Sequence, residues 1–363
     1  MSALHRILAI NPGSTSTKIS VFEDEKEVWT TKITHSSDEV AAFDSIFGQY
    51  DFRQSVIRNE LQKAGYEIST FSAIVGRGGL VYPLEGGTYE VGEILLEDLR
   101  LGVQGQHVSN LGAPIASELA HEAGCPAFIV DPVVVDEMEP LARFTGHPAI
   151  SRRSIFHALN QKAVARKVAG DLGREYEDIN LIVVHLGGGI SVGAHHRGRV
   201  IDVNNALNGD GPFTPERSGG LPVGDLVDLC FSGEVSHEDV KRMIKGAGGI
   251  VAYLDTNDML HVEKEIEKGN DEFRIVYEAM AYQVSKEVGS LAAVLKGDVD
   301  AIVITGGVAY DRNFISWIKD RVSFIAEVMV YPGEKEMESL ALGALRVLRG
   351  KEKARTYSPG SPE

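Results

Sequence analysis

Short apolar runs alternate with amphipathic stretches along most of the chain. The runs are rich in β-branched residues, and each ends at glycine, proline or a charged residue, as buried strands do. They predict strands at 7–10, 73–75, 127–130, 181–184, 301–304 and 327–331. Between them, apolar residues recur every three or four positions, which predicts helices over 46–64, 113–122, 155–169, 273–295 and 336–348. This alternation indicates an α/β protein with layered sheets and helices.

Local signals set the expected ends of two helices. Gly65 and Gly170 are expected to end the helices that precede them, because glycine readily adopts the left-handed conformation that closes a helix. Ser154 is expected to cap the helix that begins after it, since a serine oxygen accepts from the first free N–H groups.

Two of the strands run into glycine-rich turns that continue into a hairpin. The first turn is Asn11-Pro12-Gly13-Ser14, and the second is His185-Leu186-Gly187-Gly188. Glycine and small hydroxyl residues let backbone N–H groups approach phosphate oxygens. A Rossmann or Walker-type phosphate loop leads into a helix. The β-branched alternation that follows both turns therefore excludes those two motifs and predicts two equivalent strand–turn–strand units.

Composition narrows the possible classes of function. The chain has 363 residues, 43% apolar and 24% charged, which is ordinary for a soluble globular protein of about two domains. A net charge of −16, without a block of Lys or Arg, argues against a nucleic-acid partner. No apolar run is long enough for a membrane span, and no signal peptide is expected before the first strand. Cys125 and Cys230 are expected to be buried, reduced thiols, which fits a cytoplasmic protein.

Both turns contain candidate contacts for phosphate. In the first, the side chains suited to phosphate oxygens or to metal-bound waters are Asn11, Ser14, Ser16 and Lys18. In the second, the candidates are His185, Gly187, Gly188 and Gly189. Ordinary turn chemistry is the alternative for the first set, and a structural histidine is the alternative for His185. A third turn, which contains Gly306 and Gly307, follows a buried strand and is a candidate contact for adenine or ribose.

Two arginines lie in glycine-rich surroundings. Arg77 lies in the segment 75–79, and Arg217 precedes Ser218-Gly219-Gly220. A planar guanidinium can hold a carboxylate or phosphoryl group through two parallel hydrogen bonds, which lysine cannot reproduce. Both arginines are therefore candidate anion contacts, with a surface ion pair as the alternative.

Other titratable residues give weaker signals. Asp131 follows a strand directly, a position typical of site residues, and Glu336 opens the last helix, where capping is the alternative. His195 and His196 resemble a metal-binding pair, but neighbouring strand residues point to opposite faces. Two solvated hairpin histidines are therefore expected.

With these motifs, the chain resembles the acetate/butyrate kinase family over nearly its whole length, from Ile7 to Leu348. That family belongs to a superfamily with the sugar kinases, Hsp70 and actin. The resemblance implies a duplicated, two-lobed, ribonuclease H-like α/β fold with ATP bound in the cleft between the lobes. The expected lobes are 1–150 and 151–337, the helix at 338–349 is expected to rejoin the first lobe, and 350–363 is expected to form a frayed tail.

The resemblance also implies roles for individual residues. The paired substrate arginines of the family fall on Arg77 and Arg217, its catalytic aspartate on Asp131, and its active-site histidines on His157 and His185. Its magnesium-associated glutamate falls on Glu336, with Glu338 also permitted, and Asn11 would share the ion. Asp255 falls in the region that contacts the nucleotide.

Departures from the acetate kinase pattern favour the butyrate kinases within this family. Residues 156–161 read Phe-His-Ala-Leu-Asn-Gln where acetate kinases read Phe-His-Gly-Thr-Ser-His, and Gly188 replaces an asparagine. The implied reaction is Mg²⁺-dependent, reversible phosphoryl transfer from ATP to butyrate or a branched analogue, giving ADP and an acyl phosphate. A homo-oligomer of at least two subunits is also implied.

Two alternatives remain open from the sequence. One is an acetate or propionate kinase of the same family. The other is a non-catalytic ATP switch like actin or Hsp70, which Arg77 and Arg217 argue against, because a switch needs no second anion site.

Overall fold

The computed structural model describes residues 4–360 and divides the chain into two compact units. The first unit contains the described residues up to Asp136 and those from Lys335 onwards, and the second is Glu137–Glu334. The lobe boundary expected between residues 150 and 151 lies inside the second unit, and the helix expected at 338–349 lies in the first.

The first unit is built on a sheet of seven strands in the order β12-β5-β6-β4-β1-β2-β3. The strands are β1 (Arg6–Gly13), β2 (Ser16–Glu23), β3 (Lys26–Thr34), β4 (Ala73–Gly76), β5 (Thr88–Glu90), β6 (Ala127–Val130) and β12 (Arg355–Thr356). The helices are α1 (Ser37–Ala41), α2 (Tyr50–Lys63), α3 (Glu93–Leu101), α4 (Gly112–Ala123) and α12 (Glu336–Leu348).

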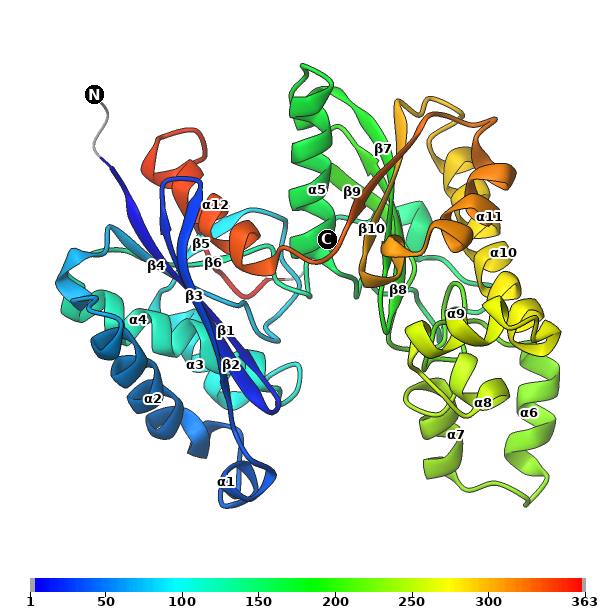
Figure 1. The fold of residues 1–363 in the computed structure, drawn as a ribbon, viewed down its shortest axis with the longest axis horizontal. Helices are drawn as coiled ribbons and strands as arrows, with labels where there is room; N and C mark the ends of the chain where they lie inside the picture. The colour runs from blue at the N-terminus through cyan, green and yellow to red at the C-terminus, as the bar shows by residue number, and fades with distance from the viewer. Residues whose placement is uncertain (1–3, 361–363) are drawn as a thin grey trace. The chain divides into compact units, whose positions relative to one another are not determined.

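The hydrophobic core of this unit follows from the alternation along its strands. Leu8 and Ile10 of β1, with Ile19 and Val21 of β2, share one buried cluster with apolar residues of α2 and α4. Helix α12 packs against β1, β4 and β6 (Figure 1). Its approach to the sheet is close, because a Cβ on Gly343 would collide with Val130. Strands β1, β4 and β6 are therefore buried on both faces.

The second unit is built on a sheet of five strands in the order β11-β10-β7-β8-β9. The strands are β7 (Asn180–Leu186), β8 (Ile190–His196), β9 (Arg199–Val203), β10 (Ala301–Gly306) and β11 (Val328–Pro332). The helices are α5 (Ala158–Asp171), α6 (Val223–Phe231), α7 (His237–Ile244), α8 (Ile250–Leu254), α9 (Met259–Glu267), α10 (Asp271–Val294) and α11 (Arg312–Val322).

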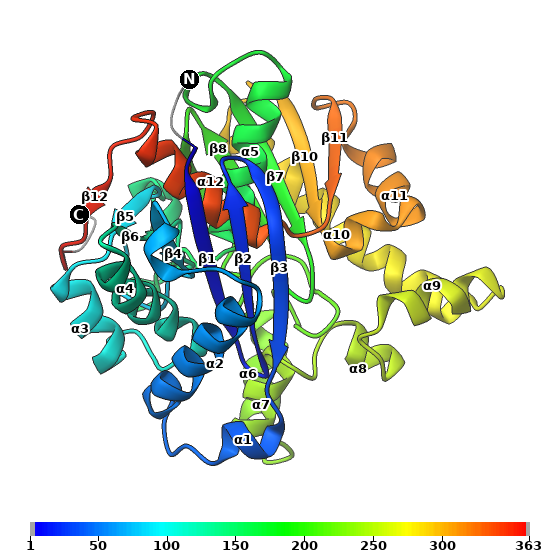
Figure 2. The same ribbon diagram turned by 60° about the vertical axis from the view of Figure 1, so that its left-hand side comes forward.

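This second sheet is also covered on both faces. Leu181 and Val183 of β7 pack with residues of α5, whereas Ile182 and Val184 pack with α10 and α11 (Figure 2). This period of two explains why the sequence of β7 is apolar at nearly every position.

The two sheets repeat one arrangement of strands. In each unit a three-stranded antiparallel hairpin ribbon (β1-β2-β3 or β7-β8-β9) is extended through its first strand by two parallel strands, β4 and β6 or β10 and β11. Helical crossovers supply the parallel connections, as a parallel sheet requires. The duplicated α/β fold predicted from the sequence is confirmed.

Several local predictions need correction. Helix α5 begins at Ala158 with His157 as its N-cap, not Ser154, because the Ile155 carbonyl accepts from the Ala206 N–H and holds this stretch outside the helix. Gly170 lies inside α5, and Gly173, with a φ of +70°, follows the helix. Gly65, with a φ of +79°, ends α2 as predicted.

Residues 350–363 were predicted to form a frayed tail, and this prediction is wrong as far as Tyr357. Arg355 and Thr356 form β12, which pairs in parallel with β5. Tyr357 is buried, and its hydroxyl donates to Asp98 Oδ2 at 2.6 Å. An aromatic side chain with a hydrogen-bond partner for its hydroxyl anchors a chain end.

The predicted burial of the cysteines is also wrong for one of them. Cys125 is half-buried, and burial raises the pKa of its thiol to about 11. Cys230 is exposed, because it lies on α6, a helix without buried residues. None of the helices between residues 4 and 360 has the length and apolar composition needed to cross a bilayer.

Candidate functional site

The first glycine-rich turn joins β1 to β2 and lies over a buried arginine, Arg53 of α2. The Arg53 guanidinium donates to the carbonyls of Ser14 (3.2 Å) and Ser16 (3.1 Å) and to Thr17 Oγ1 (2.9 Å). A further hydrogen bond reaches Gln49 Oε1 at 3.0 Å. Because the peptide group is planar and trans, a Ser14 carbonyl that faces Arg53 leaves the next N–H directed away from it.

Arg53 brings a positive charge behind this turn. Its side chain is fully buried, and no carboxylate of residues 4–360 forms an ion pair with it. Burial lowers the pKa of the guanidinium, but arginine starts so far above neutrality that it stays charged. The turn is thus backed by an uncompensated cation, which favours an anion on its outer side. Of the predicted phosphate contacts there, Ser14 and Lys18 are exposed and Ser16 is half-buried.

Asn11, Arg77 and Glu336 meet within the first unit. Asn11 Nδ2 donates to Glu336 Oε2 at 2.7 Å, and the guanidinium of Arg77 pairs with Glu336 Oε1. Glu338 instead pairs with Lys335, with 2.8 Å between Nζ and Oε2. Of the two glutamates open from the sequence, the structure brings Glu336 to the other predicted residues.

The glycines around Arg77 have a packing role that the sequence did not reveal. A Cβ on Gly76 would collide with the carbonyl of Gly112, at the start of α4. A Cβ on Gly78 would lie 2.6 Å from the Cβ of Pro132. The absence of side chains at Gly76 and Gly78 therefore lets the end of β4 pack tightly against the start of α4 and against Pro132. Arg77 lies between these two glycines, so its backbone is held in place.

Asp131 is buried at the end of β6. Its Oδ1 accepts from the Gly87 N–H at 2.7 Å, and its own N–H donates to the Gly87 carbonyl at 3.0 Å. Its φ of +38° is unfavourable for a non-glycine residue, and such strain is found at functional sites more often than elsewhere. Side-chain and backbone contacts to one residue hold this conformation.

The second glycine-rich turn follows β7 and places two histidines face to face. The rings of His157 and His185 stack with centroids 3.8 Å apart and an interplanar angle of 14°. His185 Nδ1 lies 2.7 Å from Asn160 Oδ1, and its Nε2 lies 3.0 Å from Glu334 Oε1. The two histidines implied by the family resemblance therefore form one stacked pair, with an amide and a carboxylate at the nitrogens of the buried His185.

Arg217 lies against the same turn. Its Nη1 donates to the Ala206 carbonyl at 2.6 Å. A Cβ on Gly189 would collide with the guanidinium, so glycine at this position makes room for the arginine. His185, Gly189 and Arg217 are thus brought together within the second unit.

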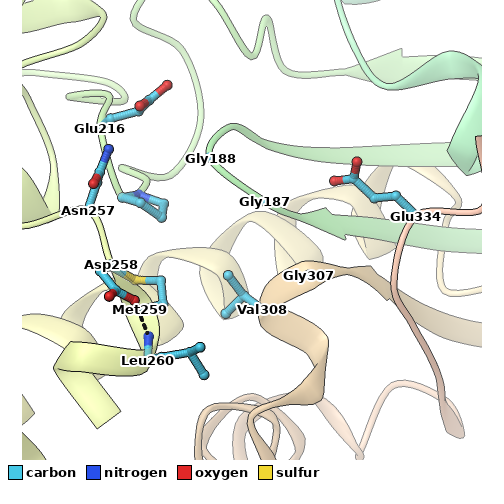
Figure 3. Close-up of a pocket in the computed structure, with 11 residues that line it drawn as sticks. Gly187, Gly188, Glu216, Asn257, Asp258, Met259, Leu260, Gly307, Val308 and Glu334 are labelled. Carbon is cyan, nitrogen blue, oxygen red and sulfur yellow. Dashed lines mark hydrogen bonds between the residues drawn. The ribbon is translucent and has the colours of Figure 1, made fainter. Parts of the chain in front are cut away.

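A pocket of about 340 Å³ opens beside this turn (Figure 3). Three of the residues predicted to contact the nucleotide line it, namely Gly187, Gly188 and Gly307. The other lining residues are Pro215, Glu216, Asn257, Asp258, Met259, Leu260, Val308 and Glu334. Its walls therefore combine bare backbone, apolar side chains and carboxylates.

Three other predicted contacts of the second unit, Gly189, Gly306 and Asp255, do not line this pocket. Gly306 ends β10 with a φ of +96°, and a Cβ there would collide with the Leu186 carbonyl, so it holds two strand ends together. Asp255 is the exposed C-cap of α8 with a φ of +54°. Two residues further on, Asn257 and Asp258 line the pocket instead.

Sequence reasoning missed Glu334, which both lines the pocket and contacts His185. The signal was present, because Glu334 follows the end of the parallel strand β11, and such strand ends gather at one edge of a sheet. Glu334 belongs to the second unit, whereas Glu336, two positions later, belongs to the first. The chain thus leaves one candidate site and enters the other within three residues.

The prediction for His195 is wrong. It is fully buried, with Nδ1 2.7 Å from the Tyr176 hydroxyl and Nε2 3.0 Å from Gln161 Oε1. Burial, with Lys162 and Arg166 nearby, lowers the pKa of His195 well below its usual range. His196 is half-buried and lies beside Asn180 Oδ1 at 2.8 Å. Within the described chain, no group of three or more His, Cys, Asp or Glu side chains is arranged to hold a metal ion.

Comparison with known proteins identifies relatives along the full length of the chain. The model of the "Acetokinase family" matches residues 144–326. Butyrate kinase 1 of Clostridium acetobutylicum is 54% identical over 354 residues, which cover 98% of this chain and 100% of the relative.

Solved structures share the fold at low identity. Acetate kinase of Porphyromonas gingivalis superimposes with a TM-score of 0.78 at 17% identity, covering 95% of this chain and 100% of that one. A propionate kinase from Francisella tularensis gives a TM-score of 0.73 at 18% identity, covering 93% and 98% of the two chains. With a family model that matches half of the sequence and a relative that is more than half identical throughout, the chain belongs to the acetokinase family.

Proposed function

We propose that the chain is a butyrate kinase, which transfers a phosphoryl group reversibly between ATP and butyrate or a branched acid of similar size. The products in the forward direction are ADP and an acyl phosphate. The observation that carries the proposal is the position of His185 and Arg217 around the turn at 187–189, of which Gly187 and Gly188 line the pocket. Full-length similarity to Butyrate kinase 1 supports the choice of acid.

The chemistry needs little from the protein beyond position and charge. A carboxylic acid with an ordinary pKa is already ionised at neutral pH, so the acceptor oxygen needs no general base. Phosphoryl transfer then depends on in-line placement and on neutralising the charge of the equatorial oxygens. Arginines and a histidine suit this task, because they donate hydrogen bonds to anions while carrying charge.

Each candidate residue receives one role in this proposal. Arg77 binds the substrate carboxylate, a group of the kind it already holds in Glu336. Arg217 and His185 contact the transferring phosphoryl oxygens, and His157 supports His185 through the stacked ring. Asp131 would orient water bound to the metal ion.

The pocket of the second unit is the proposed site for ATP. Gly187, Gly188 and Gly307 offer backbone without side chains, and Val308, Met259 and Leu260 offer apolar contacts suited to a purine or ribose. In the first unit, the turn backed by Arg53 is a second place for phosphate, through Ser14, Ser16 and Lys18.

Magnesium fits the oxygen donors of the first unit. Mg²⁺ in kinases takes one or two protein oxygens and completes its shell with phosphate and water. Asn11 and Glu336, held together at 2.7 Å, match that requirement, and a full protein cage is not expected. When bound, the ion neutralises phosphate charge. The cytoplasmic location and the homo-oligomer implied by the resemblance stay predictions.

Substitution of Gly189 by alanine is expected to impair turnover without unfolding the protein. The new methyl group would collide with the guanidinium of Arg217, and this flexible end can move aside. We expect kcat to fall on the order of 10²-fold, as when an oxyanion contact is lost. Hydroxamate trapping of the acyl phosphate measures the rate, and thermal unfolding measures stability.

Gly170→Ala is the matched control, because a Cβ there has no neighbour within 4 Å. A Gly189→Ala enzyme with normal kcat would show that Arg217 does not act at the phosphoryl group.

The preference among acids is expected to rise with chain length up to butyrate. The apolar residues that follow Arg77 in sequence begin with Leu80, Val81, Tyr82 and Pro83. Each methylene buried beside them should add about 0.8 kcal/mol, close to a fourfold gain in kcat/KM, until packing clashes begin. Most of the gain should appear in KM, because the added group is remote from the reacting oxygen.

Hydroxamate trapping with acetate, propionate, butyrate, isobutyrate and a longer acid tests this order. Acetate equal to or better than butyrate would assign the chain to acetate kinase instead. A complete absence of acyl phosphate with every acid would overturn the proposed reaction.

A further inference from the structure

A buried amide, Gln161 of α5, connects the histidine pair to the interior of the second unit. Gln161 is fully buried, and its Nε2 lies 3.0 Å from the Ser191 carbonyl oxygen and 2.8 Å from Ser191 Oγ. A carbonyl oxygen only accepts hydrogen bonds, so the nitrogen of the amide must face Ser191. The amide oxygen of Gln161 then faces His195 Nε2 at 3.0 Å.

His195 fixes the other end of this connection. Its Nε2 must carry a proton to donate to Gln161 Oε1, and its Nδ1 accepts from the Tyr176 hydroxyl at 2.7 Å. A neutral ring with the proton on Nε2 satisfies both contacts, in agreement with the lowered pKa of this buried histidine. The direction of the hydrogen bonds is therefore set from His195 toward Ser191.

The Ser191 hydroxyl accepts from Gln161 and donates in turn to His157. Three nitrogen atoms lie near Ser191 Oγ. They are Gln161 Nε2 at 2.8 Å, the backbone nitrogen of His157 at 3.5 Å and the ring Nδ1 of His157 at 2.8 Å. The first two can only donate. The hydroxyl hydrogen therefore has one acceptor among its contacts, His157 Nδ1, and the proton of the neutral His157 ring must lie on Nε2.

We propose that Gln161 is a positioning residue, which fixes His157 as the neutral tautomer protonated at Nε2. A proton on Nδ1 would face the serine hydroxyl, which would then have no acceptor for its own hydrogen. His157 is thereby held as a neutral ring, stacked 3.8 Å from His185, which faces the Glu334 carboxylate.

The consequence for catalysis rests on the proposed function. If His185 carries the charge that meets the phosphoryl group, a second charge on the stacked ring would oppose it. Gln161 would then hold the neighbour of His185 neutral without touching the substrate.

The tautomer can be read directly by NMR of the full chain labelled with ¹⁵N-histidine. Long-range correlations distinguish a protonated ring nitrogen from an unprotonated one. In the unmodified protein, His157 is expected to show an unprotonated Nδ1 and a protonated Nε2. A protonated Nδ1 and an unprotonated Nε2 on His157 would overturn the proposal, regardless of which substrate the enzyme uses.

Gln161→Glu supplies the second test. The carboxylate oxygen that replaces Nε2 no longer donates to the Ser191 carbonyl and instead accepts the hydrogen of the Ser191 hydroxyl, so His157 is expected to donate from Nδ1 and its NMR pattern to change. We expect kcat to fall about tenfold, well short of the roughly 10⁴-fold loss that a wrong tautomer causes at a general base, because His157 does not touch the substrate. KM for both substrates should stay within about twofold.

Gln283→Glu is the matched control, because the amide oxygen of Gln283 accepts from the Phe213 N–H at 3.1 Å and a carboxylate keeps that bond. His157 signals and kcat should be unchanged in this variant. A folded Gln161→Glu enzyme with the original His157 tautomer would refute the role of Gln161. If Gln161→Glu does not fold, the NMR pattern of His157 in the unmodified protein is sufficient to test the proposal. If the unmodified protein shows the expected pattern but no turnover, the result contradicts the proposed function and not the role of Gln161.

Discussion

Replacement of Arg77 by lysine is expected to lower kcat/KM for the carboxylate on the order of 10²–10³-fold. The charge is retained, and lysine can still pair with Glu336, so the first unit should remain folded. Lysine lacks the planar fork that holds a carboxylate through two hydrogen bonds. We therefore expect the loss to arise from geometry, and hydroxamate assays over a range of butyrate concentrations would measure it.

Arg58→Lys is the control for this prediction, because Arg58 lies on the surface of the same unit and pairs with Glu122. That variant should retain normal kinetics, since exposed ion pairs contribute little. Normal kcat/KM in Arg77→Lys would show that Arg77 serves Glu336 alone.

Replacement of Arg53 by methionine is expected to destabilise the first unit by about 3–5 kcal/mol. Methionine fills much of the same buried volume but donates no hydrogen bond. The carbonyls of Ser14 and Ser16 and the amide oxygen of Gln49 would lose their partner in a buried place. Urea unfolding followed by the fluorescence of Trp29, which packs against the core of this unit, would report the change.

Arg58→Met tests whether any arginine of α2 has this effect. It removes an arginine from the same helix, but a half-buried one at the surface, and should change stability by less than about 0.5 kcal/mol. Equal stability losses in the two variants would contradict a special role for Arg53 beneath the turn. If Arg53→Lys restores folding yet raises KM for ATP, the fork rather than the charge orders the turn.

The strands and helices could be predicted from the sequence because the spacing of buried apolar residues differs between the two. Strands β7 and β10 and helices α10 and α12 carry apolar residues at nearly every position that faces the core, so their existence and type could be predicted. Helices α6 and α7 were not predicted, although their apolar residues recur every three or four positions, and the structure buries none of these residues. Strand β12 has two residues, too few for any period.

The candidate site was only partly accessible. The two turns could be found because glycine and small polar residues are rare between β-branched runs. Arg53 could not, because one arginine on an amphipathic helix looks like a surface residue, and its partners are backbone carbonyls more than 35 positions away. Gln161 was likewise hidden, since its importance depends on which of its two ends faces Ser191.

The first unit is assembled from both ends of the chain, with α12 and β12 arriving after the whole second unit. On the ribosome, the strands β1, β2 and β4 must therefore wait with one face uncovered until α12 has been synthesised. The second unit is continuous and can complete its core earlier. Although domains usually fold in the order of synthesis, here the N-terminal unit is the last to finish. Chains that stop before residue 336 would expose apolar strands, which makes them targets for chaperones and proteases.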